Sequence, residues 1–302
     1  MENRFLDVPI ISIDSTTCNK CGLCSKICPI RVFDFRKEEI PVIQNNDECV
    51  LCGQCLCVCP TNSINHSGFD KSNFIKIQNK SKIDTNNAFV FLTQRRSVRN
   101  YRKEIPSNEI LEKIANIAGF APSGPHHRVG WIRNITIVSG YDNMKIVSDI
   151  SADYMTKMIK TLGSWYMKLA AKYDDRAKAA LGIIPSFKYS LNEYKTGNDL
   201  ITYNAPAAIF LHAPIKSSTP QTDCDAACML IQLYAEANGL GTCWNGIIQG
   251  AAAGDYIKNF KKMSEFLKIP NGHKCYAAMT IGFPSIKLHS IPERKTEISW
   301  IN

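Results

Sequence analysis

The chain has 302 residues, of which 45% are hydrophobic and 21% charged, close to the composition of soluble globular proteins. This composition excludes a disordered chain and a fibrous repeat, and the length is sufficient for two domains. No stretch approaches the roughly 18 apolar residues of a membrane span, and the start, MENRFLDVPI, carries acidic residues where a signal peptide is basic. We therefore expect a cytoplasmic protein with no membrane partner.

Cysteine is concentrated near the N-terminus, where nine of the 13 cysteines lie between Cys18 and Cys59. A disulfide scaffold is one explanation for such density, but it belongs to small secreted domains. A structural zinc site is another, but its Cys-x-x-Cys pairs usually stand apart and supply four ligands in total. Here the cysteines form two unbroken runs 31 residues apart, each followed by proline: Cys18, Cys21, Cys24 and Cys28, then Cys49, Cys52, Cys55 and Cys59.

These two runs resemble those of bacterial-type ferredoxins with two 4Fe-4S clusters, in which the fourth cysteine of each run binds the other cluster. Such crossing ties the two halves together and makes metal binding a large part of the folding energy of a segment with little core. The resemblance implies one cluster on Cys18, Cys21, Cys24 and Cys59, and a second on Cys49, Cys52, Cys55 and Cys28.

Three other residues of this segment carry expectations. Gly22 and Gly53 lie inside the runs, where a missing side chain would let the backbone approach a cluster; an ordinary turn is the alternative. Cys57 fits no ligand position, so we expect it to be a small buried side chain.

A polar connection rich in Lys and Asn follows Pro60, which predicts a domain boundary near residue 80, with domains of 1–80 and 81–302. Apolar residues recur at helical intervals from Ala88 onward, which predicts a helix. Ser107 is placed to cap a further helix that ends by Pro122. Later segments are predicted as two strands, ITIVSG and AAIFLHAP, a helix over 223–238 and a last strand, CYAAMTIGFP. Helices and short apolar strands alternate, which indicates a mixed α and β domain.

Four motifs in the larger domain, RRSVRNY, APSGPHHRVGW, GLGTCWNG and IGFPSIKLHSIPERK, occur in the order found in the nitroreductase family of FMN enzymes. The resemblance covers about 88–302, and the whole chain resembles fused ferredoxin and nitroreductase proteins of anaerobes. It implies an α+β fold, in which a nitroreductase-like sandwich with a central, mainly antiparallel sheet and flanking helices follows the ferredoxin-type domain. It also implies a homodimer whose flavin sites lie across the interface.

The resemblance assigns residues to the flavin. Arginine forks suit the FMN phosphate, and positive charge suits the reduced ring. On the family pattern Arg95 and Ser97 bind the phosphate and ribityl portion, Arg99 lies near the same chain, and Arg294 reaches the phosphate. Arg96 is also assigned there, with a solvated basic residue as the alternative. The expected cofactor-binding residues are Arg95, Arg96, Ser97, Arg99, Pro122, Ser123, Gly124, His126, Gly241, Thr242 and Arg294.

The family pattern also gives roles near the ring. Pro122, Ser123 and Gly124 would cover it from the partner subunit, while Gly241 and Thr242 would offer backbone donors.

Two further pairs of residues have alternative interpretations, and no catalytic residue is assigned. His126 stands where family members commonly carry Asn; with His127 it either supplies a proton to the substrate or lies in an exposed loop. Cys224 and Cys228 lie one helical turn apart, and we expect buried small side chains rather than a redox pair.

The expected function is that of an oxidoreductase in which electrons enter through the clusters, collect on FMN and pass to a nitro compound, quinone or activated alkene. A Rossmann fingerprint is absent, so the donor is either NAD(P)H stacking on the flavin or a redox protein. The alternatives are an electron-transfer adaptor for a protein partner and a redox sensor. Each of the two clusters and the flavin phosphate would add a charge of about −2 to the formal net charge of +9. The resulting net charge of about +3 argues against a nucleic-acid partner.

Overall fold

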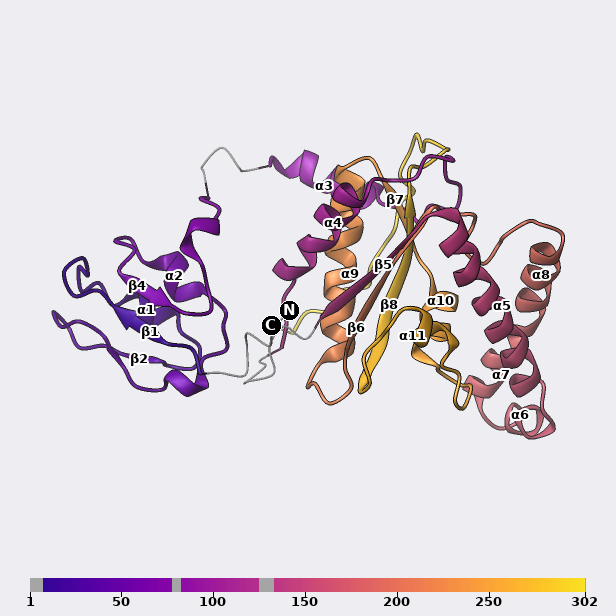
Figure 1. Ribbon diagram of the computed structural model, residues 1–302, viewed down its shortest axis with the longest axis horizontal. Coiled ribbons are helices and arrows are strands. Elements are labelled where there is room, and N and C mark those ends of the chain that lie inside the picture. Colours follow the sequence, from indigo (N-terminus) through magenta and orange to yellow (C-terminus); the bar gives the residue numbers. More distant parts are fainter. Residues whose placement is uncertain (1–7, 78–82, 125–132, 302) are drawn as a thin grey trace. The chain divides into compact units, whose positions relative to one another are not determined.

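The computed structural model of the chain describes residues 8–77, 83–124 and 133–301 (Figure 1). The described residues divide into two compact units: an N-terminal unit of 8–77 with 123–124, and a larger unit of 83–122 and 133–301. Each unit has its own core.

Within residues 8–77, two short antiparallel β-ribbons accompany two one-turn helices. Their packed core is small and consists mainly of Ile11, Cys24, Val32, Phe33, Leu56 and Ile64. So little buried apolar surface makes this unit dependent on additional stabilisation. The elements are β1 (Ile11–Ile13) paired with β4 (Ile64–His66), β2 (Phe33–Asp34) paired with β3 (Val42–Ile43), α1 (Leu23–Ile27), α2 (Gln54–Val58), and the 3-10 turns η1 (Asn46–Glu48) and η2 (Lys71–Asn73).

The 31-residue repeat of the sequence is also a repeat of the backbone. Helices α1 and α2 start and end at equivalent positions, and Cys28 and Cys59 occupy their C-caps with nearly the same dihedral angles. Left-handed residues recur at the same offset in the described segment: Lys20 and Leu51, Gly22 and Gly53, and Arg31 and Asn62.

Gly22 and Gly53 both have φ 69°, which other residues adopt only with strain. A Cβ on Gly22 would lie 2.5 Å from the ring of Phe35, and one on Gly53 would lie 3.2 Å from the ring of Phe69. The structure therefore explains both glycines by backbone conformation and an aromatic side chain packed on each. The expected reason, close approach to a cluster, is not needed.

The described residues of the larger unit form a four-stranded, fully antiparallel sheet in the order β5-β6-β8-β7, which confirms the α+β prediction. Alternate residues of its central strand β6 face opposite sides. Phe210 packs with α5 and α10, while Ile209 and Leu211 are buried on the other face. The strands are β5 (Asn134–Ser139), β6 (Ala207–Pro214), β7 (Gly241–Trp244) and β8 (His273–Gly282).

Helices cover both faces of this sheet: α4 and α9 lie on one side, α5, α10 and α11 on the other, with α6 to α8 beyond α5 (Figure 1). Ser107 caps α4 as predicted, because its hydroxyl accepts a hydrogen bond from the Ile110 amide at 3.3 Å. In the described ranges, no helix is long and apolar enough to cross a membrane. The helices are α3 (Thr85–Gln94), α4 (Asn108–Asn116), η4 (Ile117–Phe120), α5 (Tyr141–Leu162), α6 (Trp165–Ala170), α7 (Asp175–Gly182), α8 (Ile184–Lys195), α9 (Pro220–Ala237), α10 (Gly246–Ala253) and α11 (Lys262–Phe266).

Candidate functional site

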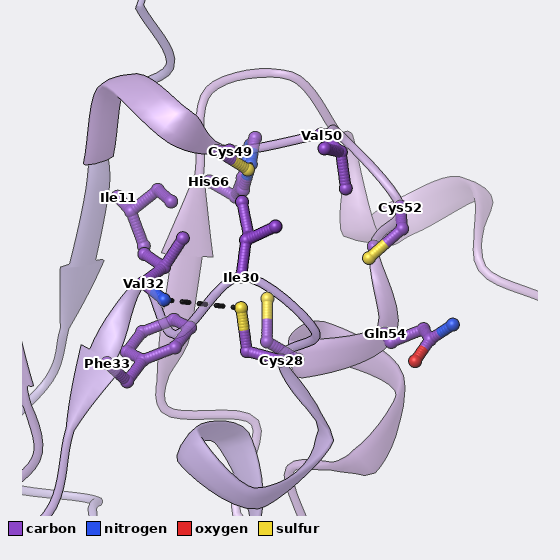
Figure 2. Close-up of a pocket in the computed structure, with 12 residues that line it drawn as sticks. Ile11, Cys28, Ile30, Val32, Phe33, Cys49, Val50, Cys52, Gln54 and His66 are labelled. Carbon is purple, nitrogen blue, oxygen red and sulfur yellow. Dashed lines mark hydrogen bonds between the residues drawn. The ribbon is translucent and has the colours of Figure 1, made fainter. Parts of the chain in front are cut away.

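The eight cysteines of the two runs line two separate hollows in the N-terminal unit. Figure 2 shows the first of them. Each hollow takes three cysteines from one run and the fourth from the other, which is the crossed grouping that the resemblance to ferredoxins implies. The first hollow holds Cys28, Cys49, Cys52 and Cys55, and the second holds Cys18, Cys21, Cys24 and Cys59.

Backbone amides point at several of these sulfur atoms. The amide of Val32 donates to Cys28 Sγ at 3.3 Å, and its repeat counterpart, the amide of Ser63, donates to Cys59 Sγ at the same distance. Such donors stabilise negative charge on sulfur. The turn after each helix is thus shaped to receive a thiolate.

The surroundings of three of these cysteines favour the neutral thiol. Burial raises the pKa of Cys24 and Cys49, and it raises that of Cys55 to about 12. For Cys59 burial acts in the same direction, but hydrogen bonds from Thr61 and the Ser63 amide bring its pKa below the ordinary value. A coordinated metal deprotonates such thiols outright.

The donor set of each hollow fits an iron–sulfur cluster. All-sulfur ligation is typical of zinc or iron–sulfur centres. Among the described residues, no three His, Cys, Asp or Glu side chains converge closely enough to hold a single metal ion. The four sulfurs instead surround a hollow, as a multi-iron cluster requires.

Cys57 lies outside both sets, as expected, but the prediction that it is buried is wrong. It is exposed, whereas its neighbour Leu56 is only 5% exposed. The one-turn helix α2 directs Leu56 into the small core, and successive helical side chains point in different directions.

In the larger unit, three of the four motifs lie side by side. Ser97 forms a parallel bridge with Thr242, and the Val98 amide donates to the Thr242 carbonyl at 2.9 Å. Tyr101 forms an antiparallel bridge with Pro284, and the Arg102 amide donates to the Phe283 carbonyl at 2.8 Å. The segment 95–102, named here the arginine segment, thereby extends the sheet beside β7 and continues along the chain that leaves β8.

Two glycines allow this close approach. A Cβ on Gly241 would lie 2.5 Å from Val98 Cγ2, and a Cβ on Gly282 would lie 2.9 Å from the ring of Tyr101. Thr242 is 2% exposed and lies between the arginine segment and β8. These contacts give Gly241 and Thr242 a structural role, and donation to a flavin ring by their backbone stays a prediction.

Arg95, Arg96 and Arg99 of the segment have different surroundings. Arg96 Nη1 donates to the carbonyls of Thr93 at 2.6 Å and Arg95 at 2.8 Å, so it closes the C-terminus of α3. Arg95 is half-buried near Glu236; burial raises the pKa of that carboxyl, and Arg95 counteracts the shift. Arg99 is exposed, as is Ser97. A cation at Arg95 or Arg99 is therefore freer to meet a ligand than one at Arg96.

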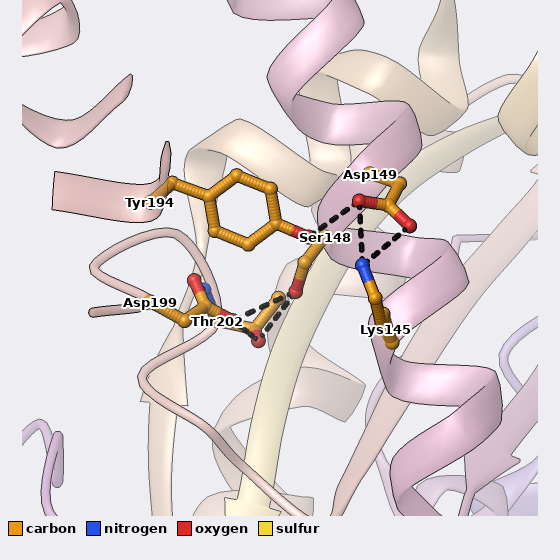
Figure 3. A network of polar contacts seen from close by, with 6 residues as sticks. All are labelled: Lys145, Ser148, Asp149, Tyr194, Asp199 and Thr202. Carbon is orange, nitrogen blue, oxygen red and sulfur yellow. Dashed lines mark hydrogen bonds and ion pairs between the residues drawn. The ribbon is translucent and has the colours of Figure 1, made fainter. Parts of the chain in front are cut away.

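The Arg99 guanidinium lies over the ring of Tyr203, 5.6 Å from its centroid. Tyr203 and Asn204 have positive φ values of 59° and 49°, in a turn held by the buried Asp199. The Asp199 carboxylate accepts hydrogen bonds from the hydroxyls of Ser148 at 2.8 Å and Thr202 at 2.6 Å, as Figure 3 shows, and from two backbone amides. This network, which sequence reasoning missed, positions Tyr203 beside the arginine segment.

The remaining predicted residues have few described contacts. Pro122 is exposed, and its carbonyl accepts a hydrogen bond from Arg133 at 3.1 Å. Ser123 and Gly124 follow it, whereas His126 lies outside the described residues. Arg294 is exposed, in a segment, 285–301, that is exposed throughout, so the described contacts do not place it beside the other arginines.

The sequence profile of the nitroreductase family matches residues 92–283, which is more than half of the chain. The chain belongs to the nitroreductase family. A second profile, that of the 4Fe-4S dicluster domain, matches residues 17–63. These matches confirm the predicted fusion and make the chain an iron–sulfur protein and an oxidoreductase of a flavin-dependent family.

Individual ferredoxins match the N-terminal unit. The ferredoxin of Methanothermococcus thermolithotrophicus is 34% identical over 56 residues, which cover 18% of this chain and 92% of that protein. An uncharacterised ferredoxin of Methanocaldococcus jannaschii has the same identity over the same length, 89% of its chain. The N-terminal unit is thus a ferredoxin-type domain.

Solved structures of nitroreductases share the fold of the larger unit. The nitroreductase with bound FMN from Bacteroides fragilis has a TM-score of 0.51 and 19% identity, covering 72% of this chain and 100% of that one. An FMN-dependent nitroreductase from Clostridium difficile has a TM-score of 0.50, 20% identity and the same coverage. Both confirm the α+β nitroreductase-like fold.

Proposed function

We propose that this nitroreductase-family chain, with domains of 1–80 and 81–302, passes electrons between two 4Fe-4S clusters and FMN and reduces a small organic acceptor. Nitro compounds, quinones and activated alkenes are the acceptor classes. The observation that carries the proposal is the crossed grouping of eight cysteines in a chain whose arginine segment is bridged to β7. In this proposal a single chain combines two one-electron carriers with a domain of a flavin-dependent family.

FMN supplies the necessary conversion when bound, because a flavin accepts electrons singly and delivers them in pairs. In this proposal Arg95 and Ser97 bind its phosphate and ribityl portion, and Arg99 contributes positive charge beside them. Arg96 takes part only if its guanidinium leaves the α3 carbonyls that it now contacts. The turn that Asp199 organises keeps Tyr203 against Arg99.

A second copy of the chain completes the site in this proposal. Several large apolar side chains of α3 and of the C-terminal segment are exposed, among them Phe89 at 66% and Trp300 at 82%. A homodimer would remove them from water. The partner subunit would then cover the flavin ring with its residues 122–124, and Arg294 would reach the phosphate.

The test is an anaerobic spectral titration of the purified holoprotein, after its iron, sulfide and FMN contents have been measured. Reduced ferredoxin is added in one cuvette and NADH in another, and the product is mixed with nitro, quinone and alkene acceptors. The expected result is reduction of both chromophores followed by reoxidation by at least one acceptor class. Absence of FMN, or a reduced protein that no acceptor reoxidises, would contradict the proposal.

A further inference from the structure

His66 is a buried residue that neither cysteine spacing nor the family motifs single out. It lies at the end of β4, is 6% exposed and lines the hollow formed by Cys28, Cys49, Cys52 and Cys55. Its Nε2 lies 3.4 Å from Cys49 Sγ (Figure 2). A nitrogen at this distance from sulfur is within hydrogen-bonding range.

The hydrogen bonds of the ring decide which nitrogen carries the proton. His66 Nδ1 accepts a hydrogen bond from the Gly68 amide at 3.0 Å, so Nδ1 has no proton of its own. The proton of the neutral imidazole is therefore on Nε2, which faces Cys49. Phe69 packs edge-on against the same ring, with centroids 5.1 Å apart, and fixes its orientation.

The internal repeat shows that this donor belongs to one hollow. The repeat counterpart of His66 is Phe35, 31 residues earlier, whose side chain has no N–H group and packs on Gly22. The second hollow has a different polar neighbour, the Thr61 hydroxyl, 3.7 Å from Cys59 Sγ, where either atom can donate. The two cysteine sets therefore have similar backbones and different side-chain partners.

We propose that His66 Nε2–H donates to the Cys49 thiolate and raises the reduction potential of the cluster bound by Cys28, Cys49, Cys52 and Cys55. Adding an electron makes a cluster more negative, and a donor to its sulfur stabilises that extra charge. His66 is thus a potential-setting residue that makes the two clusters unequal. The inference rests on the two-cluster part of the proposed function.

The test is an EPR-monitored redox titration of the holoprotein and of two variants. His66→Phe installs the residue of the other half of the repeat and removes the donor, whereas His66→Gln retains an N–H group. We expect His66→Phe to lower one of the two midpoint potentials by at least about 59 mV, which corresponds to a tenfold change in the equilibrium constant of a one-electron reduction. The other potential should stay unchanged, and His66→Gln should shift less. Unchanged potentials, or equal shifts of both clusters, would overturn the inference.

Two further measurements keep the test decisive. Thr61→Val should alter only the other cluster, which assigns the two couples. If His66→Phe fails to assemble clusters, pulsed EPR of the wild-type protein labelled with ¹⁵N-histidine decides: coupling of one histidine nitrogen to one cluster is expected, and its absence refutes the inference. Wild-type protein that lacks clusters by iron analysis would refute the proposed function, whereas loaded clusters without this coupling would refute the role of His66 alone.

Discussion

Ser97 and Thr242 form a parallel bridge that joins the arginine segment to β7, although the two residues lie far apart in the sequence. Gly241 permits this contact, because any side chain there would meet Val98. The position of the arginine segment thus depends on a small residue in another motif.

Gly241→Ala should therefore weaken both the fold and FMN binding. Its Cβ would lie 2.5 Å from Val98 Cγ2, and such overpacking costs about 1–3 kcal/mol. Urea unfolding and FMN titration measure the two effects. Gly246→Ala is the matched control, since its Cβ would meet nothing within 4 Å. Adding Val98→Ala should partly restore the Gly241→Ala variant; wild-type stability and FMN affinity in that single variant would contradict the prediction.

Arg95→Ala should raise the FMN dissociation constant about 10- to 100-fold, the size expected for losing a charge-assisted hydrogen bond of about 1.5–3 kcal/mol. Fluorescence titration of apoprotein with FMN measures it. Arg176→Ala, which removes the same charge from an exposed position on α7, should leave the affinity unchanged. Arg96→Ala should mainly destabilise the end of α3, because that side chain contacts helix carbonyls. Equal losses of affinity in the Arg95 and Arg176 variants would show that only net charge matters.

Cys59→Ser should impair the cluster of the other run, because Cys59 shares a hollow with Cys18, Cys21 and Cys24. We expect anaerobically purified protein to lose up to half of its iron and sulfide, and the N-terminal unit to lose stability since its core is small. Cys57→Ser is the control, because that cysteine is exposed and lines neither hollow. Full iron content in the Cys59 variant would contradict the assignment of Cys59 as a cluster ligand.

The stability of the larger unit should fall as the pH drops from about 6.5 to about 4. His212 Nδ1 lies 3.1 Å from His273 Nδ1, and burial, aided by His273, lowers the pKa of His212 to about 4. An unfolded histidine titrates near 6.5, so the unfolded chain binds more protons in this window and stability is lost as pH falls. The loss is about 2–3 kcal/mol.

Tryptophan fluorescence reports this unit, since Trp165, Trp244 and Trp300 belong to it. His212→Gln should flatten the pH dependence of urea unfolding between those values. His289→Gln, at an exposed position, is the control and should leave this pH dependence unchanged. An unchanged slope in the His212 variant would assign the acid sensitivity to other groups.

Several features of this protein followed from short stretches of sequence. Ser107 caps its helix, and the cysteine runs recur at one spacing, because caps and cluster loops depend on residues a few positions apart. The central strands were recognisable since they consist mostly of apolar residues, as buried strands do. Helices α5 to α8 were not predicted, and β7 was recognised only as a motif, because four residues are too few to show a strand pattern.

Tertiary structure decided which of these residues meet. The spacing of residues along the sequence could not predict the contact of His66 with Cys49, the packing of Gly241 on Val98 or the exposure of Cys57. Each depends on which side a strand or helix turns toward the core, and that is settled by the packing of distant segments. The sequence by itself determined the chemistry that the chain carries, through the residue types in its motifs. The fold determined which donors and charges face each other, because hydrogen bonds and close packing act only over a few ångströms.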